Sequence, residues 1–462
     1  MGISRFLSWV PDPPVRGGRR HATQWGIVSQ PQARIVIIGG GPGGYEAALV
    51  AAQLGAAVTI IERDGLGGAC VLTDCVPSKT LIATSGQMTA LEGSPDLGIQ
   101  AGAVASVDAP RLYARVRDLA RAQSDDVASR LCAEGVEVVS GTARVVGRRV
   151  VAVADREIEA DAVLIATGAQ PRVLPGAVPD GDRVLTWRQL YDLKELPPDL
   201  IVVGSGVTGA EFAGAYQALG SQVTLVSSRE HVLPHEDADA AMVVEDVFRR
   251  RGMTVLGRSR AAEVRRTGDS VAVILADGRT VRGSHCLLTV GMVPSTTGLG
   301  LEEHGVAVDK NGFIPVDRVS RTSVPGVYAA GDCTGVMMLA SVAAMQGRIA
   351  MWHALGEAVQ PLRLSHVAAT IFTEPEIATV GVTEQAVESG EAEAVVVKLP
   401  LATNARAKMQ GFRDGFVKLF ARRSGGTVLG GVVVAPRASE LILAVSLAVE
   451  QMLTVDQMAH TF

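Results

Sequence analysis

Two cysteines, Cys70 and Cys75, stand five positions apart and are the side chains of this sequence best suited to redox chemistry. The residues that follow them, Val76 to Lys79, read as the first turn of a helix. A helix N-terminus lowers the pKa of a thiol, and a second thiol nearby can resolve a mixed disulfide. The spacing therefore predicts a catalytic dithiol, with a chance pair as the alternative. No second Cys or His pair at ligand spacing accompanies it, so no metal site is expected. The remaining cysteines are expected to be small buried hydrophobes: Cys132, Cys286 and Cys333.

The segment upstream of the cysteines has the pattern of a dinucleotide-binding βαβ unit. A buried strand is expected at residues 34–38, and Gly39, Gly41 and Gly44 follow it before a helix. These glycines permit a tight turn, the approach of a pyrophosphate, and close packing of helix on strand. A second strand ends at Glu62, whose carboxylate can accept both hydroxyls of a ribose.

The same pattern returns later in the chain with Gly204, Gly206 and Gly209. In the first unit the acid stands 23 positions after the first glycine, and the position 23 after Gly204 holds Ser227. A carboxylate there would repel the 2′-phosphate of NADP, whereas a serine would not.

The residues around Ser227 therefore bear on the choice of nicotinamide cofactor. Ser227, Ser228 and Arg229 could hydrogen-bond and pair with a 2′-phosphate. We predict that this second site accepts NADPH without excluding NADH. In the alternative, Arg229 is a solvated loop residue and NADH is preferred.

Together these motifs resemble the class I pyridine nucleotide-disulfide oxidoreductases, the flavoproteins that include dihydrolipoamide dehydrogenase. Other signatures of that family follow in the same order. They are its adenine-side glycine (Gly141), its Ala-Thr-Gly turn (Ala166, Thr167, Gly168), its Gly-x-x-Pro turn (Gly291), its second FAD motif (Asp332), and the segment passing under the flavin ring (Met338, Leu339, Ala340, Ser341).

The resemblance implies an α/β fold with two Rossmann-like domains, the NAD(P) domain being inserted in a split FAD domain, and a C-terminal α+β dimerisation domain. It also implies FAD and either NADPH or NADH as cofactors, and a homodimer. We expect these limits: a disordered or mis-started extension at 1–31, FAD domain at 32–175, NAD(P) domain at 176–291, FAD/central domain at 292–362, and an apparently truncated dimerisation domain at 363–462.

The resemblance also implies roles for the dithiol and its neighbours. Cys70 would be the interchange thiol that meets a disulfide substrate, and Cys75 the charge-transfer thiol against the flavin. Lys79 would lie near flavin N5 and pair with Glu211.

The sequence around the cysteines departs from the common form of the family. Ala69 replaces the usual Thr, and residues 72–74 replace the usual Asn-x-Gly. This variant resembles an actinobacterial branch whose members reduce quinones. Ser341, where lipoamide enzymes have His, indicates the same branch.

Disulfide-reducing members carry a catalytic His-Glu pair at the C-terminus, and its place would fall beyond Phe462. His460 stands too early to be that histidine. A general base is worth roughly 10²- to 10⁴-fold, so we expect feeble lipoamide turnover. We therefore predict an FAD-dependent NAD(P)H oxidoreductase acting on a quinone. The alternatives are a dihydrolipoamide dehydrogenase-like enzyme that uses Cys70 and Cys75, and a non-catalytic FAD-binding scaffold.

The composition of the chain excludes other classes of protein. Its 462 residues, 47% hydrophobic and 20% charged, suit a soluble protein of about three domains. A net charge of -5 argues against nucleic acid as a partner. No apolar run approaches the roughly 20 residues of a membrane span. Five cysteines in so long a chain indicate a reducing, cytoplasmic compartment.

Overall fold

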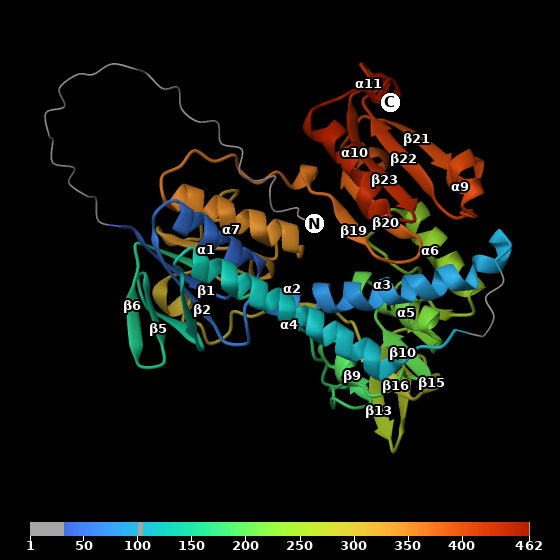
Figure 1. Cartoon of the computed structure of the whole chain (residues 1–462), viewed down its shortest axis with the longest axis horizontal. Helices are drawn as coiled ribbons and strands as arrows, with labels where there is room; N and C mark the ends of the chain where they lie inside the picture. The colour runs from blue at the N-terminus through green and yellow to red at the C-terminus, as the bar shows by residue number, and fades with distance from the viewer. Residues whose placement is uncertain (1–31, 100–104, 462) are drawn as a thin grey trace, which may run out of the picture. The chain divides into compact units, whose positions relative to one another are not determined.

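The computed structural model describes residues 32–99 and 105–461, and the predicted extension at 1–31 lies outside them (Figure 1). The first sheet is parallel, with strand order β18-β7-β1-β2-β3. Its strands are β1 (Arg34–Ile38), β2 (Ala57–Glu62), β3 (Glu137–Ser140), β7 (Ala162–Ile165) and β18 (Val327–Ala329). Strand β18 follows the second nucleotide fold in the sequence. The first nucleotide fold is therefore split into two segments of the chain, with the second fold inserted between them.

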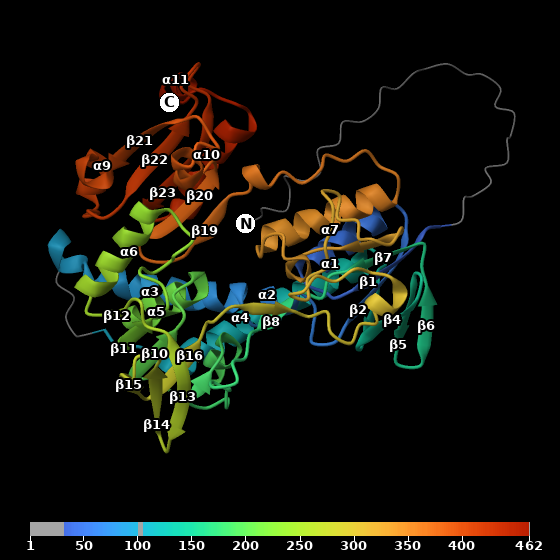
Figure 2. The same cartoon turned by 180° about the vertical axis from the view of Figure 1, so that it is seen from behind.

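Two helices cover one side of the first sheet and pack closely on each other. Helices α1 (Pro42–Gln53) and α7 (Ala340–Ala354) lie side by side (Figures 1 and 2). A Cβ atom at Gly347 would lie 2.0 Å from the carbonyl oxygen of Gly43, so only glycine allows this approach. Between β3 and β7 the chain forms an antiparallel meander of β4 (Ala143–Gly147), β5 (Val150–Val153) and β6 (Arg156–Glu159).

The second sheet is also parallel, with order β12-β11-β10-β16-β9. Its strands are β9 (Val184–Leu185), β10 (Asp199–Val203), β11 (Gln222–Val226), β12 (Thr254–Leu256) and β16 (His285–Leu288). Its helices are α5 (Val207–Leu219) and α6 (Ala238–Arg250), and the short helix η2 (Trp187–Asp192) follows β9. An antiparallel sheet is formed by β13 (Ala261–Thr267), β14 (Ser270–Leu275) and β15 (Thr280–Gly283). The chain enters and leaves this unit through the paired strands β8 (Ala169–Pro171) and β17 (Met292–Pro294).

Cys70 and Cys75, the predicted dithiol, belong to helices that connect the two nucleotide folds. The short helix α2 (Gly68–Leu72) is followed by α3 (Cys75–Glu92), η1 (Ser94–Leu97) and the long helix α4 (Ala109–Ala133). Helix α3 packs on α4 and on α5 of the second fold. The dithiol is thus carried by an element in contact with both folds.

The C-terminal sheet is antiparallel, with order β19-β20-β23-β22-β21. Its strands are β19 (Ala369–Ile371), β20 (Glu376–Gly381), β21 (Val395–Pro400), β22 (Phe416–Ala421) and β23 (Val428–Ala435). Helix α10 (Ala438–Glu450) packs on β20 and β23. The remaining elements are α8 (Glu384–Glu388), α9 (Ala405–Met409), α11 (Val455–Ala459), η3 (Glu302–His304), η4 (Asp332–Thr334), η5 (Leu364–His366) and η6 (Leu401–Thr403).

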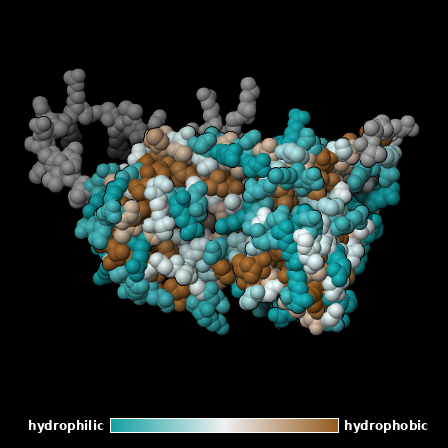
Figure 3. Space-filling view, turned by 90° about the horizontal axis from the view of Figure 1, so that it is seen from below, coloured by the Kyte–Doolittle hydropathy of each residue, from teal (hydrophilic) through white to brown (hydrophobic). Residues whose placement is uncertain are grey.

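This architecture confirms the predicted fold class: two Rossmann-like folds, one interrupted by the other, followed by an α+β domain. The residue limits of the domains stay predictions. Apolar and polar side chains are interspersed on the face seen in Figure 3. No helix within residues 32–99 or 105–461 has the length and apolar character needed to span a membrane.

Candidate functional site

The loop between β1 and α1 has the geometry of a phosphate cradle. A Cβ atom at Gly39 would lie 2.3 Å from the carbonyl oxygen of Ala166, and one at Gly44 would lie 1.9 Å from that of Gly39. Both positions therefore require glycine because of neighbouring backbone. At Gly41, the N-cap of α1, a Cβ atom would meet nothing within 4 Å. That space, next to the helix N-terminus, is where a pyrophosphate can approach.

Glu62 closes this cradle from the end of β2. One carboxylate oxygen accepts from the amide of Gly40 at 2.6 Å, and the other accepts from the amides of Arg63 and Asp64 at 2.8 and 2.7 Å. These bonds fix the orientation of the carboxylate. Since each carboxylate oxygen has two lone pairs, these three bonds leave one acceptor position, on the oxygen that binds Gly40, for one ribose hydroxyl.

The other predicted FAD positions lie around the same sheet. Gly141, directly after β3, donates its amide to the carbonyl oxygen of Glu62 at 2.9 Å. Gly168 adopts φ +66° after β7, and Gly291 adopts φ +97° before β17. The hydroxyl of Thr167 is buried, and its one neighbour able to hydrogen-bond among the described residues is the weak thiol partner Cys333. A thiol is a weak hydrogen-bond partner, so this buried hydroxyl fits a site that a polar ligand completes.

Asp332 and the start of α7 complete this region. Asp332 begins η4, and burial together with the nearby Asp74 raises the pKa of its carboxyl to about 6. The sequence analysis missed Gln346, a buried residue of α7 whose side-chain oxygen accepts from the amide of Gly331 at 2.8 Å. Its only sequence signal is a polar residue on the buried face of an apolar helix. The predicted flavin-side residues precede or begin α7: Met338, Ala340 and Ser341 are exposed and Leu339 is half-buried.

The loop between β10 and α5 repeats the cradle almost atom for atom. A Cβ atom at Gly204 would lie 2.3 Å from the carbonyl oxygen of Thr289, and one at Gly209 would lie 1.9 Å from that of Gly204. At Gly206 a Cβ atom would again meet nothing within 4 Å. The residues of both loops therefore fit dinucleotides.

The turn after β11 differs from the prediction at one residue. Ser227 is fully buried, and its hydroxyl is hydrogen-bonded to that of Ser205 at 2.7 Å and to the amide of Arg229 at 3.1 Å. Ser227 thus shapes the turn instead of presenting its hydroxyl to a 2′-phosphate. Ser228 and Arg229 are exposed, and their contact with a 2′-phosphate stays a prediction.

The two predicted redox cysteines are brought together between the nucleotide folds. Cys70 lies in α2 and Cys75 begins α3; both are half-buried free thiols. Hydrogen bonding between the two side chains raises the pKa of Cys70 and lowers that of Cys75. The second thiol is therefore the first to ionise. Cys286 and Cys333 are buried as predicted, but the prediction for Cys132 is wrong, because that residue lies on the exposed side of α4.

Lys79 and Glu211 form the predicted ion pair, with 2.8 Å between Nζ and Oε2. Burial lowers the pKa of Lys79, but Glu211 outweighs it and leaves the pKa raised. The other oxygen of Glu211 accepts from the amide of Phe372 at 2.9 Å, and Lys79 Nζ lies 5.0 Å from the centre of that ring. Phe372 was not predicted as a site residue. The pair thus joins both nucleotide folds to the C-terminal domain.

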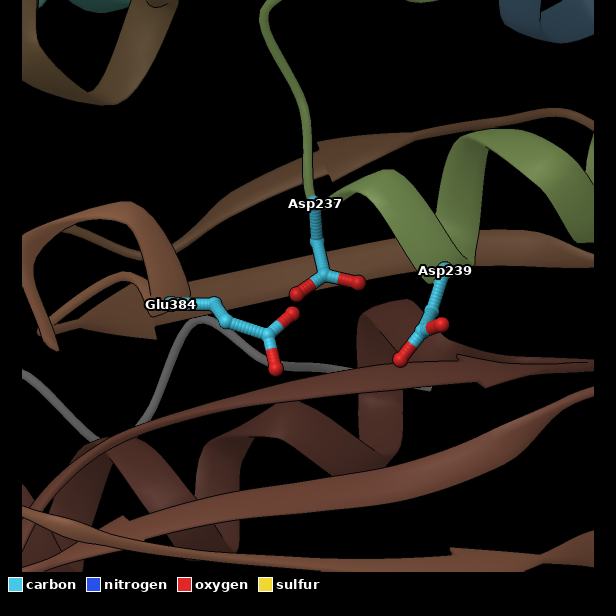
Figure 4. Close-up of side chains that lie close together, drawn as sticks. All are labelled: Asp237, Asp239 and Glu384. Atoms are coloured by element: carbon cyan, nitrogen blue, oxygen red, sulfur yellow. The ribbon is translucent and has the colours of Figure 1, made fainter. Parts of the chain in front are cut away.

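A group of three acids forms a separate cluster between α6 and the C-terminal domain. Asp237, Asp239 and Glu384 point their carboxylates toward one another, within 4.8 Å between oxygens (Figure 4). The buried ammonium of Lys418 binds all three, at 2.8 Å from both Asp237 and Asp239. Burial lowers the pKa of Lys418, but its hydrogen bonds to the three acids leave that pKa raised. Lys398 also pairs with Asp239, at 2.7 Å, so two lysines and three acids form an ion-pair network.

Comparisons with known proteins agree with this geometry. Residues 33–347 match the family described as pyridine nucleotide-disulphide oxidoreductase, and residues 367–462 match its dimerisation domain. An NAD(P)H dehydrogenase (quinone) of Mycobacterium tuberculosis is 56% identical over 443 residues, which are 93% of this chain and 90% of the relative. A dihydrolipoyl dehydrogenase of Chlorobaculum tepidum is 35% identical, with 93% of each chain covered.

Solved structures give the same result. The crystal structure of LpdA from Mycobacterium tuberculosis superposes with a TM-score of 0.88 at 56% identity, covering 93% of this chain and 96% of that one. The HOCl-induced flavoprotein disulfide reductase RclA of Escherichia coli superposes with a TM-score of 0.83 at 26% identity, with 93% and 96% covered. The chain is an enzyme of the pyridine nucleotide-disulphide oxidoreductase family, whose cofactors are FAD and NAD(P)H.

Proposed function

We propose that this protein transfers electrons from NAD(P)H through FAD to a quinone. The observation that carries the proposal is the 56% identity, over 93% of the chain, to a relative named NAD(P)H dehydrogenase (quinone). The geometry supports it, since both dinucleotide cradles are formed and glycine is required at equivalent positions in each. FAD, when bound, accepts a hydride from the nicotinamide and passes the electrons to the acceptor.

The residues of the chain would bind and orient the two cofactors. The N-termini of α1 and α5 offer amides to the two pyrophosphates, and Glu62 takes the ribose of the first cofactor. Asp332 and the segment from Met338 to Ser341 would hold the ribityl chain and the ring of FAD. Buried Glu211 holds the half-buried ammonium of Lys79 one helical turn from Cys75, where it would lie beside the flavin ring.

The choice of nicotinamide cofactor depends on the turn after β11. Ser228 and Arg229 are exposed there, and no acid follows β11 directly in the sequence. We therefore propose that NADPH is accepted along with NADH.

A second candidate function is reduction of a disulfide such as lipoamide by Cys70 and Cys75. The adjacency of the two thiols, with Cys75 at the N-terminus of α3, favours it. Relatives named dihydrolipoyl dehydrogenase, such as that of Chlorobaculum tepidum, add support at lower identity.

One experiment separates the two candidates. The FAD-loaded protein is titrated anaerobically with NADPH or NADH, and turnover is then assayed with menadione and with lipoamide. Reduction of the flavin and rapid menadione turnover with little lipoamide turnover are expected. A long-wavelength thiolate–flavin band together with efficient lipoamide turnover would reverse the assignment. Flavin that neither nucleotide reduces would contradict both functions.

We also infer that the active form is a cytoplasmic homodimer. The match to a dimerisation domain supports the dimer, as do apolar side chains left exposed on that domain. The cysteine usage supports a reducing compartment.

A further inference from the structure

The turns after β11 and β12 lie against each other at the carboxyl ends of two neighbouring parallel strands. The amide of Ser259 donates to the carbonyl oxygen of Ser227 at 2.7 Å, and the amide of Arg258 donates to that of Arg229, also at 2.7 Å. In parallel α/β sheets, ligands bind outside the carboxyl ends of the strands. Both turns therefore belong to the edge of the second sheet where a nucleotide binds.

Gly257 is the residue that lets the two turns approach each other. A Cβ atom there would lie 2.3 Å from the carbonyl oxygen of Glu230, far inside van der Waals contact. Arg258 follows with φ +51°, a conformation that is uncommon for residues other than glycine. The close approach at Gly257 and the amide bond to Arg229 together fix the backbone of Arg258 beside Arg229.

The first nucleotide fold shows what the position of Arg258 faces. There Glu62, the residue expected to bind a ribose, lies opposite Ser140, and the next residue, Gly141, donates its amide to the carbonyl oxygen of Glu62 at 2.9 Å. In the second fold Ser227 takes the place of Glu62. Continuing the register of β11 and β12 by one residue makes Arg258 the equivalent of Gly141. An arginine therefore stands beside the ribose position, where the first fold has a glycine.

The side chain of Arg258 has the charge and the donors to bind a phosphate. It is 74% exposed and forms an ion pair with Glu230. An ion pair this exposed is worth about 1 kcal/mol or less, and this bond uses one of the five N–H donors of a guanidinium. Arginine binds phosphate oxygens through paired N–H bonds, so a phosphate can be bound while Glu230 stays paired. The pair also neutralises Glu230, an acid of this turn that would otherwise repel a 2′-phosphate.

We propose that Arg258 is a specificity-determining residue that, together with Arg229, binds the 2′-phosphate of NADPH and offsets the charge of Glu230. This inference rests on the proposed function, because it concerns the nucleotide that supplies the electrons. NADH carries a hydroxyl in place of that phosphate and is bound through the cradle between β10 and α5, without either guanidinium. The chain therefore accepts both nucleotides, and the two arginines set the preference between them.

Ligand binding without turnover tests this assignment. The oxidised, FAD-loaded protein is titrated by calorimetry with adenosine 2′,5′-bisphosphate and with 5′-AMP, which differ only in the 2′-phosphate. Arg258→Gly, which suits the positive φ, should weaken binding of the bisphosphate about tenfold, the value of one exposed charge-assisted hydrogen bond, and should leave 5′-AMP unchanged. Arg258→Lys, which keeps the charge, should lose less. Arg265→Ala removes another exposed arginine paired with a glutamate and should match the wild type.

Three results of these titrations would overturn the proposal. They are wild-type affinity of Arg258→Gly for the bisphosphate, an equal loss for both ligands, which would show that Arg258 only shapes the turn, and a wild-type protein that binds both ligands equally. In steady-state assays, Arg258→Gly should raise the KM for NADPH about tenfold and leave the KM for NADH unchanged. The titrations involve no electron acceptor, so their failure is distinct from a failure of quinone reduction, which menadione turnover by the wild type tests.

Discussion

Asp332 is a half-buried acid whose ionisation opposes folding as long as no cofactor is bound. Burial and the neighbouring Asp74 raise the pKa of Asp332 to about 6, whereas the unfolded chain titrates near its model value of 3.8. A raised folded pKa gives stability that is complete below about pH 4 and is lost as the pH passes 6.

Asp332→Asn should therefore stabilise the apoprotein at pH 8, by about 3 kcal/mol at most, and should have no effect near pH 4. The thermal midpoint of the FAD-free protein at the two pH values measures this. Asp96→Asn, at an exposed acid, serves as the control. A stabilisation that is as large at pH 4 as at pH 8 would contradict the assigned pKa. FAD affinity should fall in the variant if Asp332 binds the ribityl chain.

Because Ser227 is buried, Arg229 is the residue predicted to pair with the 2′-phosphate of NADPH. Arg229→Ala should raise the KM for NADPH about tenfold, the value of one or two charge-assisted hydrogen bonds, and should leave the KM for NADH unchanged. Steady-state rates with each nucleotide and one quinone give both constants. Arg265→Ala, at an exposed arginine of β13 paired with Glu263, is the matched control. An equal rise in KM for NADPH and NADH would show that Arg229 shapes the turn after β11 and does not bind the 2′-phosphate.

Motifs of fixed local spacing were predictable from the residues, and the distant Lys79–Glu211 pair was predictable only from the family resemblance. The two cradles could be predicted because the glycines of each follow a fixed spacing between a strand and a helix, and the first and last of them are packed against backbone. The spacing of 23 from Gly204 located Ser227, but the bond to Ser205 that buries it depends on the folded turn. Phe372 meets the Lys79–Glu211 pair from a distant domain, and nothing in its local sequence indicates this.

At the scale of elements, Lys418 of β22 joins α6 and α8 to the C-terminal sheet. Lys418→Met should destabilise the protein by about 3–5 kcal/mol, because Asp237 would stay buried without its ammonium. The pKa values of the three acids would then rise, so the loss should be larger at pH 8 than at pH 5. Thermal midpoints of the FAD-loaded protein at both pH values provide the measurement.

Lys398 offers a control for this network within the same sheet. Its Nζ lies 2.7 Å from Asp239, but its side chain is 40% exposed, and among the described residues it forms an ion pair with that acid alone. Lys398→Met should therefore cost about 1 kcal/mol or less. Equal stability of Lys418→Met and Lys398→Met at every pH would contradict the role of Lys418 in joining α6 and α8 to the C-terminal sheet.

At the scale of the whole molecule, exposed apolar side chains gather on the C-terminal domain, where we propose that the homodimer forms. Val395, Val397 and Leu399 of the edge strand β21 alternate along one face and are 41%, 51% and 63% exposed. Leu443 and Leu447, one turn apart in α10, are 61% and 52% exposed. A monomer would leave these groups in water, and β21 would present an unprotected apolar edge.

A charge placed in this surface should separate the subunits. Leu443→Arg should shift the mass in solution from twice 48.1 kDa to 48.1 kDa, as measured by light scattering across a concentration series. Leu54→Arg, at an exposed leucine directly after α1, should leave the mass unchanged. If Leu443→Arg stayed dimeric, the mass of Leu399→Lys would be measured in the same way. A monomeric Leu399→Lys would show that β21 forms the contact between subunits. A wild-type protein of 48.1 kDa at all concentrations would refute the homodimer itself.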